Sequence, residues 1–291
     1  MRLFRKNKKD EFTGAAPEET ILFPLKRIEF PYKKTKEEAW KALLEKIESQ
    51  RELQPHSFFM EWKYRAVAAV IAVLVASVSW LAYHACNETV FCPYARQMSV
   101  RLPDQSLVSL NAGTRLSYNK LTWKFHRTVA VEGEAFLTVQ KGRRFTVKTS
   151  EAEIAVLGTS FNVFARSGRV RVNCYTGRVL VTPRKYHTEA LVLTPGKETV
   201  VSKDEKPAIS AFDAERGVAW QKGEFYFNHE PLSMVLQEVE RQYNVHIEYR
   251  GVSTRFYTGY FTNRNLTETL DLICIPMNLH YQMKGKTIII N

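Results

Sequence analysis

The chain has 291 residues, with 42 Lys and Arg against 30 Asp and Glu, and a formal net charge of +12 at pH 7. Its basic residues are scattered among predicted strands, which favours a solvated surface over a nucleic-acid interface. The four cysteines form no Cys-x-x-Cys or Cys/His pattern with zinc-site spacing, which argues against a structural zinc domain.

The first 65 residues form a head with one convincing helix, predicted over residues 36–53. Thr35 can cap this helix, and Glu38 completes a capping box. The rest of the head is rich in proline and charge and offers little with which to build a core. The apolar stripe of the helix therefore packs on a partner protein, on the membrane surface or on another copy of the chain. Its members are Ala39, Trp40, Leu43, Leu44 and Ile47.

Residues 66–85, from Ala66 to Ala85, contain no Asp, Glu, Lys or Arg. As a helix centred near Val73 this run would rise about 30 Å, the thickness of a bilayer's hydrocarbon core. A buried core helix would show a polar stripe, and a signal peptide would be shorter and nearer the start. Trp80 and Tyr83 near the end resemble an interfacial aromatic belt. We therefore predict a single transmembrane helix.

Charge on the two flanks predicts the orientation of this helix. Arg51, Lys63 and Arg65 precede the run, whereas only Arg96 lies in the fifteen residues after it. The more positive side stays in the cytoplasm, so we expect a cytoplasmic head and an exported remainder. An oxidising compartment would allow Cys86 and Cys92 to pair, while Cys174 and Cys274 are expected to be buried thiols.

Residues 98–202 consist of short alternating or apolar runs separated by turn signals, including Glu132-Gly133 and Pro195-Gly196. This pattern predicts an antiparallel β-sandwich or jelly-roll-like domain. The predicted strands are 107–110, 128–131, 135–139, 145–147, 154–156, 161–164, 170–172, 179–181 and 191–193.

Residues 203–219 are expected to be a linker, followed by a small α+β domain over residues 220–291. A strand at 224–228, a helix from Pro231 to Tyr243 and a strand at 245–249 form one β-α-β unit. A second unit follows, with a strand at 257–261, a helix at 266–275 started by Asn265 or Thr267, and strands at 279–283 and 287–290. The repeat is weak but covers the whole domain.

No catalytic, cofactor-binding or metal-ligating constellation stands out. Glu132 and Glu134 lie on one strand face, as paired carboxylates do in glycosidases, but such pairs also occur on the wet face of any sheet. No phosphate-binding loop is present. The sequence therefore favours a protein that binds and transmits over a glycan-processing enzyme.

Four motifs in order resemble those of FecR-type transmembrane anti-sigma factors of the Bacteroidetes branch. The first runs from Leu102-Pro103-Asp104 to Asn111-Ala112-Gly113, with Gln105 in place of the usual glycine. The others contain Gly133-Glu134, then Leu157-Gly158-Thr159-Ser160-Phe161-Asn162, and lastly Pro195-Gly196. The C-terminal domain of that branch is similar at Trp220, Gly223, Phe227, Pro231-Leu232, Val235, Tyr243 and Gly285.

The resemblance implies a single-pass inner-membrane regulator without cofactors. Outside the cytoplasm it would receive the signalling domain of an outer-membrane TonB-dependent transducer. Inside, Trp40, Leu43, Leu44 and Ile47 would contact an extracytoplasmic-function sigma factor, with a membrane protease in the relay. Residues 1–34 do not resemble the helical sigma-binding region of the family, so a membrane-tethered periplasmic binding or scaffold protein is the alternative.

Overall fold

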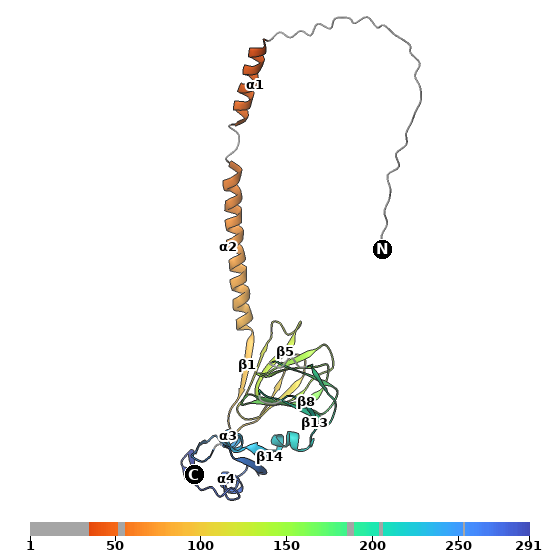
Figure 1. Ribbon diagram of the computed structural model, residues 1–291, viewed down its shortest axis with the longest axis vertical. Helices are drawn as coiled ribbons and strands as arrows, with labels where there is room; N and C mark the ends of the chain where they lie inside the picture. The colour runs from red at the N-terminus through yellow and green to blue at the C-terminus, as the bar shows by residue number, and fades with distance from the viewer. Residues whose placement is uncertain (1–34, 52–55, 185–188, 204–205, 253) are drawn as a thin grey trace, which may run out of the picture. The chain divides into compact units, whose positions relative to one another are not determined.

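The computed structural model describes residues 35–51, 56–184, 189–203, 206–252 and 254–291 (Figure 1). The chain divides into two units, residues 1–71 and 72–291. Residues 1–34 lie outside the described residues.

The helix predicted in the head is α1, Lys36–Arg51. The Thr35 amide donates to Glu38 Oε2 at 3.0 Å, which is one half of the predicted capping box. The predicted contact residues of this helix remain exposed, and their large apolar side chains find no core in the described part of the head. They are Trp40, Leu43, Leu44 and Ile47, at 63%, 49%, 47% and 53% exposure.

A second helix, α2, spans His56–Ala85. Its segment Trp62–Ala85, 24 residues long, is long and apolar enough to cross a membrane, and none of it is buried within the protein. The predicted run from Ala66 to Ala85 lies inside this segment. The Ser77 hydroxyl donates to the Val73 carbonyl oxygen at 2.7 Å, so this polar group is already paired within the helix, as a membrane-spanning helix requires.

After α2 comes a β-rich unit (Figure 1), in which the described residues form thirteen strands. The first six are β1 (Asn87–Cys92), β2 (Met98–Arg101), β3 (Leu107–Leu110), β4 (Thr114–Asn119), β5 (Arg127–Thr138) and β6 (Phe145–Lys148). They are followed by β7 (Ala152–Val156), β8 (Ser160–Arg166), β9 (Arg169–Cys174), β10 (Val179–Pro183), β11 (Leu191–Leu193), β12 (Lys197–Val201) and β13 (Ile209–Ala211). The expected β-rich fold is confirmed.

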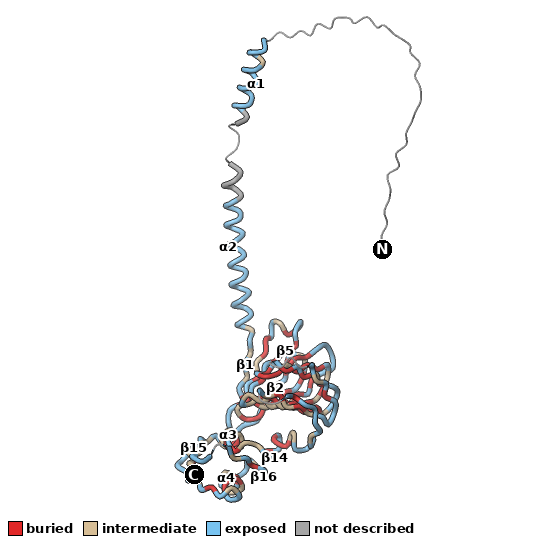
Figure 2. The backbone as a smooth tube through the Cα atoms, in the orientation of Figure 1, coloured by how far each residue is buried: buried red, intermediate tan, exposed pale blue. Residues whose placement is uncertain are grey.

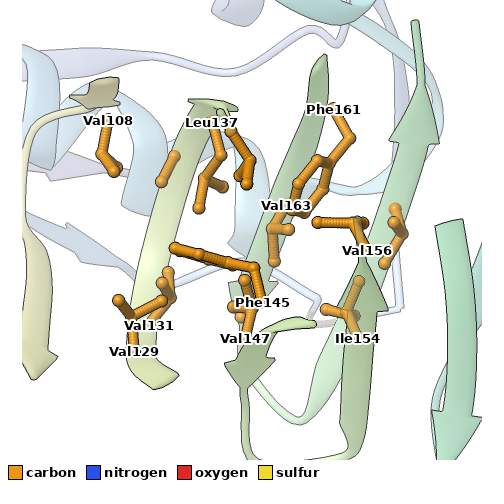
Figure 3. Close-up of a cluster of buried hydrophobic side chains, with 14 of the residues drawn as sticks. Val108, Val129, Val131, Leu137, Phe145, Val147, Ile154, Val156, Phe161 and Val163 are labelled. Atoms are coloured by element: carbon orange, nitrogen blue, oxygen red, sulfur yellow. The ribbon is translucent and has the colours of Figure 1, made fainter. Parts of the chain in front are cut away.

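Nine of these strands form one continuous path, β11-β10-β7-β6-β5-β8-β9-β12-β13, and β1 to β4 join it at β5. The pairs in this unit are antiparallel except β5 with β6. Alternation places every second side chain inward, and the inward valines, leucines and phenylalanines form one core (Figure 3). Val129, Val131, Phe145, Ile154 and Phe161 are central to it and at most 1% exposed.

One predicted turn is wrong. Glu132-Gly133 does not separate two strands but lies within β5, a single strand of 12 residues. The first part of β5 pairs with β4 and β6, and the part from Gly133 onward pairs with β8. Gly133 has a φ of 122°, and a Cβ there would lie 2.7 Å from the Thr114 Cα. Glycine thus lets one strand bend between two sets of partners.

The strands of this unit begin with β1, before the expected boundary at residue 98, since β1 pairs with β4 along its whole length. At the other end, the expected linker 203–219 contains β13, which pairs with β12. It also leads into a 3-10 helix, η1 (Arg216–Lys222), which buries Trp220.

The C-terminal module contains both predicted β-α-β units. Its elements are β14 (Glu224–Pro231), α3 (Leu232–Tyr243), β15 (His246–Tyr249), β16 (Phe256–Thr262), α4 (Leu266–Cys274), β17 (Tyr281–Lys284) and β18 (Thr287–Ile290). The first strands of the two units, β14 and β16, pair with each other, and β15 pairs in parallel with β18. The two repeats are therefore interleaved. Their apolar faces meet in a second core containing Phe225, Val235, Phe261, Ile273 and Ile288.

Pairing of Cys86 with Cys92 is contradicted: all four cysteines are free. Because β1 is extended, the six residue-to-residue steps from the Cys86 Cα to the Cys92 Cα span about 20 Å, far beyond the ~7 Å that a disulfide allows. Cys92 is instead buried, and its thiol donates to the Arg96 carbonyl oxygen at 3.3 Å. Cys174 and Cys274 are buried, as expected.

Candidate functional site

Polar side chains gather where the β-rich unit meets the C-terminal module. We call this set the polar cluster. The β-rich unit contributes side chains from β5, from β8 and from the turn before β4, and the module contributes side chains from η1 and α3. Five of these eight residues are buried and the other three are half-buried; buried stretches of the chain are red in Figure 2. The members are Asn111, Glu134, Asn162, Arg166, Trp220, Glu238, Arg241 and Gln242.

Glu134 on β5 accepts two hydrogen bonds, one on each carboxylate oxygen. Asn111 Nδ2 donates to Oε2 at 2.8 Å, and Asn162 Nδ2 donates to Oε1 at 3.0 Å. The Trp220 indole, which can only donate, fixes the Asn162 amide by donating to its Oδ1 at 3.2 Å. The Ala112 amide fixes Asn111 in the same way at 2.8 Å. The NH2 groups of both asparagines are thereby turned toward Glu134, whose carboxylate accepts a hydrogen bond from each.

A second carboxylate, Glu238 on α3, faces two arginines. Arg241 donates to Glu238 Oε2 through Nε and Nη2 at 3.0 and 2.8 Å. The Arg166 Nη1 from β8 lies 4.0 Å from the same oxygen. Gln242 links the two carboxylate groups, because its Nε2 lies 2.8 Å from Glu238 Oε1 and 2.9 Å from Asn111 Oδ1. One connected network therefore joins both domains.

The two carboxylates differ in their affinity for a proton. Burial raises the pKa of Glu134, and the nearby charge of Glu238 raises it further against the opposing effects of Arg166 and the two asparagines. Burial alone would also raise the pKa of Glu238, but Arg166 and Arg241 hold that pKa below its ordinary value. Burial lowers the pKa of the Arg166 guanidinium. The charges are balanced, with two carboxylates facing two arginines.

Further contacts tie the domains at the rim of the cluster. Glu230 on β14 pairs with Arg171 and, at 2.8 Å, with Arg169, both on β9. Gln97 donates to the Trp220 carbonyl oxygen at 2.5 Å, and the Ala95 amide donates to the Arg241 carbonyl oxygen at 2.8 Å. A groove of about 640 Å³ opens beside these contacts, lined by Glu134, Phe164, Arg171, Trp220, Glu230 and Tyr260 among others.

The predicted motif residues outside the cluster serve the β-rich core or its turns. Leu102 and Phe161 are buried. Asp104 pairs with the buried Arg127 and accepts from the Ser106 amide at 3.1 Å, so the turn after exposed Pro103 is held by a buried ion pair. Gln105, at a φ of 67°, takes the left-handed conformation favoured by glycine, the usual residue of the motif that this segment resembles.

A second groove, also about 640 Å³, is lined by the next motif, Leu157-Gly158-Thr159. Leu157 is 64% exposed, whereas Thr159 is buried and donates to the Arg178 carbonyl oxygen at 3.2 Å. Pro195 and Gly196 form an exposed turn between β11 and β12. The motifs therefore do not meet at one point: only Asn111, Glu134 and Asn162 converge, with Trp220 of the C-terminal pattern.

Glu132 and Glu134 both occupy outward positions of β5, as predicted, but their surroundings differ. Glu132 is exposed and lies 3.4 Å from Arg115, whereas Glu134 is enclosed by two asparagines. Within the described part of the chain, no group of three or more His, Cys, Asp and Glu side chains is arranged to hold a metal ion.

Comparison with known proteins agrees with the motifs. The family described as FecR protein matches residues 90–180, and the family described as FecR, C-terminal matches residues 224–290. Two crystal structures of a candidate anti-sigma factor from Parabacteroides distasonis, at 2.50 and 1.65 Å resolution, are similar at 30% identity. Each match covers 70% of this chain and 98% of the solved chain, with TM-scores of 0.65 and 0.64. The chain belongs to the FecR family. None of the curated proteins matches it.

The polar cluster joins the two FecR matches. Asn111, Glu134, Asn162 and Arg166 fall in the first, and the three α3 residues fall in the second. Arg166, Glu238, Arg241 and Gln242 were not predicted as site residues. No motif in the sequence marks the last three, and their role is seen only in the structure, where Glu238 and Gln242 are as buried as the apolar stripe of α3, at 4% exposure each.

Proposed function

We propose that this FecR-family protein is an inner-membrane anti-sigma regulator, with α1 in the cytoplasm and the two matched domains in the periplasm. The observation that carries the proposal is the exposed apolar face of α1. Trp40, Leu43, Leu44 and Ile47 are all at least 47% exposed on a short helix that precedes a candidate span. Such a face is stable in water only when a partner covers it.

The proposed partner of that face is an extracytoplasmic-function sigma factor. The family and the resemblance of the exterior to a candidate anti-sigma factor support a sigma regulator. On the other side of the membrane, the proposed input is the signalling domain of an outer-membrane TonB-dependent transducer. A membrane protease would complete the relay by releasing the head. The site residues proposed for the cytoplasmic step are the four apolar residues of α1.

Copurification tests the cytoplasmic step. Full-length protein carrying Trp40→Ala and Leu43→Ala is expected to copurify with at least tenfold less sigma factor than the wild type does. The reason is that two side chains that would be buried in the proposed interface are removed. Glu45→Ala, on the opposite face of α1, is the matched control and should retain it. Both changes keep helix propensity, since alanine is the best helix former. Equal recovery of the sigma factor with all three proteins would refute the proposal.

Reporter fusions test the orientation. Alkaline phosphatase, which is active only after export, should be active when fused after Asn291 and inactive when fused before Lys36. The proposal rests on more basic residues before the span than after it. The opposite pattern of activity would refute the proposed orientation, and with it a signal that passes from the periplasm to the cytoplasm.

The alternative is a membrane-tethered periplasmic binding or scaffold protein, which the groove beside the polar cluster favours. It predicts that replacing residues 1–60 with an unrelated sequence leaves the cellular phenotype intact. Loss of the sigma response on that replacement would instead support the regulator.

A further inference from the structure

The turn between β4 and β5, residues 120–126, exposes apolar side chains that the core does not use. Leu121 and Phe125 are 51% and 74% exposed. Trp123 between them is 5% exposed and packs edge-on against Tyr118 and Phe145, with ring centroids 5.5 and 6.0 Å away. The side chains of Leu121 and Phe125 therefore face solvent, whereas that of Trp123 is packed in the core. We call this segment the β4–β5 turn.

The turn is held in one conformation. The Thr122 amide donates to Asn119 Oδ1 at 3.0 Å, and the amides of Phe125 and His126 donate to the Thr122 carbonyl oxygen at 2.9 and 2.8 Å. The exposure of Phe125 therefore belongs to an ordered turn anchored by a buried tryptophan. A fixed, exposed phenylalanine of this kind marks a contact surface.

Hydrogen bonds fasten the same turn to the end of the candidate span. Asn119 Nδ2 donates to the Tyr83 carbonyl oxygen at 2.8 Å, and the Lys120 amide donates to the Cys86 carbonyl oxygen at 3.0 Å. Only Cys86 lies between the end of α2 at Ala85 and the start of β1 at Asn87, and Asn87 pairs with Asn119. Since no longer linker intervenes, the β4–β5 turn lies level with the last turn of α2, where a membrane-spanning helix leaves the hydrocarbon.

The charges around the turn suit an anionic surface. Lys120, Lys124 and Arg143 are exposed, and Arg143 donates to the Lys124 carbonyl oxygen. One carboxylate, Glu88, is also present and pairs with Lys120 and Tyr118. Lys120 is thereby neutralised, and Lys124 and Arg143 give the patch its positive balance. Basic side chains beside a membrane are attracted to anionic lipid headgroups.

We propose that the β4–β5 turn is a second membrane contact. Leu121 and Phe125 enter the boundary between headgroups and acyl chains, and Lys124 and Arg143 face anionic headgroups. Lipid is the occupant because the turn is bonded to the residues that leave the bilayer. The β-rich unit is then attached to the membrane at two points, α2 and the turn, which restricts its rotation about the end of the helix. The proposal needs α2 to cross the bilayer but not the direction in which it crosses.

Lipid-dependent quenching tests this contact in the full-length chain. In a Cys86→Ser background, the fluorophore NBD is attached to Phe125→Cys, Val73→Cys or Ile275→Cys. Ile275 is a matched site on the C-terminal module with 71% exposure. Proteoliposomes of phosphatidylethanolamine and phosphatidylglycerol carry lipids with nitroxide-labelled acyl chains. NBD at positions 73 and 125 should be quenched at least twofold more than at 275. Quenching at 125 equal to that at 275 would overturn the proposal, and if position 73 were still quenched, the span itself would stand.

A lipid exchange tests the role of charge. Replacing phosphatidylglycerol with phosphatidylcholine should reduce quenching at position 125, and Lys124→Gln with Arg143→Gln should abolish this dependence on anionic lipid. Both substitutions are at exposed positions, so the fold should be retained. A double variant that remains as sensitive to phosphatidylglycerol as the parent would overturn the assignment of these two cations.

Discussion

Replacing Glu134 with glutamine tests whether the polar cluster binds the two FecR domains together. The substitution keeps the size of the side chain but turns one acceptor oxygen into a donor. Asn111 and Asn162 both donate to Glu134, at 2.8 and 3.0 Å. Neither amide can turn around freely, because the Ala112 amide and the Trp220 indole donate to their oxygens. Glu134→Gln therefore sets two donors against each other.

The expected cost follows from that one mismatch. A buried donor left without an acceptor costs about 1–3 kcal/mol. For a folded part of this size, a mid-range loss of about 2 kcal/mol lowers the midpoint of thermal unfolding by about 4–8 °C. Glu132→Gln is the matched control, since its carboxylate lies two residues away on the same strand and is 74% exposed. Such a surface change should stay within about 0.5 kcal/mol.

The assay is thermal unfolding of the full-length chain in one detergent, followed by near-ultraviolet circular dichroism. A second variant reverses the direction of the hydrogen bond. In Glu134→Gln with Asn162→Asp, the new carboxylate accepts from both the introduced glutamine amide and the Trp220 indole, and the net charge is unchanged. This double variant should recover at least half of the loss, whereas Asn162→Asp alone should destabilise by setting two carboxylates together. The reasoning is wrong if Glu134→Gln melts like Glu132→Gln, or if the double variant melts lower than either single one.

Three further predictions concern the span, a motif turn and the response to acid. Val73→Arg places a charge at the centre of the span at a cost of about 2.5–3.5 kcal/mol on the insertion scale, so carbonate-resistant membrane fractionation should fall; unchanged fractionation would count against the topology. Gln105→Gly should stabilise by up to about 1 kcal/mol, because a left-handed residue is relieved while some unfolded-state entropy is added; a lower unfolding midpoint in urea would contradict this. The pKa of Glu238 is depressed in the folded state, so its stabilisation is present above the ordinary value of 4.5 and is lost as pH falls through the folded pKa. Glu238→Gln should therefore flatten the acid side of the stability profile, and a slope equal to the wild type's would refute that assignment.

The C-terminal module was predictable because its signals are local. The apolar stripe of α3 has helical spacing, and Asn265 caps α4 by accepting from the amides of Thr267 and Glu268 at 3.0 and 3.3 Å. Turn residues separate the strands. The interleaving of the repeats was not predictable, since the pairing of β15 with β18 joins residues far apart in the sequence.

The error at Gly133 has a physical cause. Glycine next to an acidic residue is a common turn signal, but here it allows a long strand to bend and to approach Thr114 closely. A single sequence contains no distinction between these uses of glycine, because both depend on backbone conformation. Strand β4 was missed for a related reason: its pattern is mixed, and its partners β1 and β5 define it.

The candidate site was half visible in the sequence. Glu134 and Asn162 stood out as motif residues, but their neighbours on α3 look like ordinary solvent-facing side chains. Only the packing of the module against the β-rich unit shows that Glu238 and Gln242 are buried. The converging motif positions make hydrogen bonds between the two domains, which accounts for their polar character.

The direction of the hydrogen bonds also bears on how the β-rich unit and the C-terminal module could come apart. Trp220 donates to Asn162, Asn162 donates to Glu134, and Asn111 accepts from Gln242, so each link fixes the orientation of the next. An opening between the module and the β-rich unit that is too narrow to admit water would leave several buried donors unpaired at once, each costing about 1–3 kcal/mol, whereas full separation would let water pair them. Partial opening is therefore disfavoured, and the polar cluster favours two states of the domain contact, closed or open. A ligand that binds only the open state would have to supply the whole difference in free energy between the closed and open states. The polar cluster therefore sets the minimum binding free energy that is needed to separate the domains.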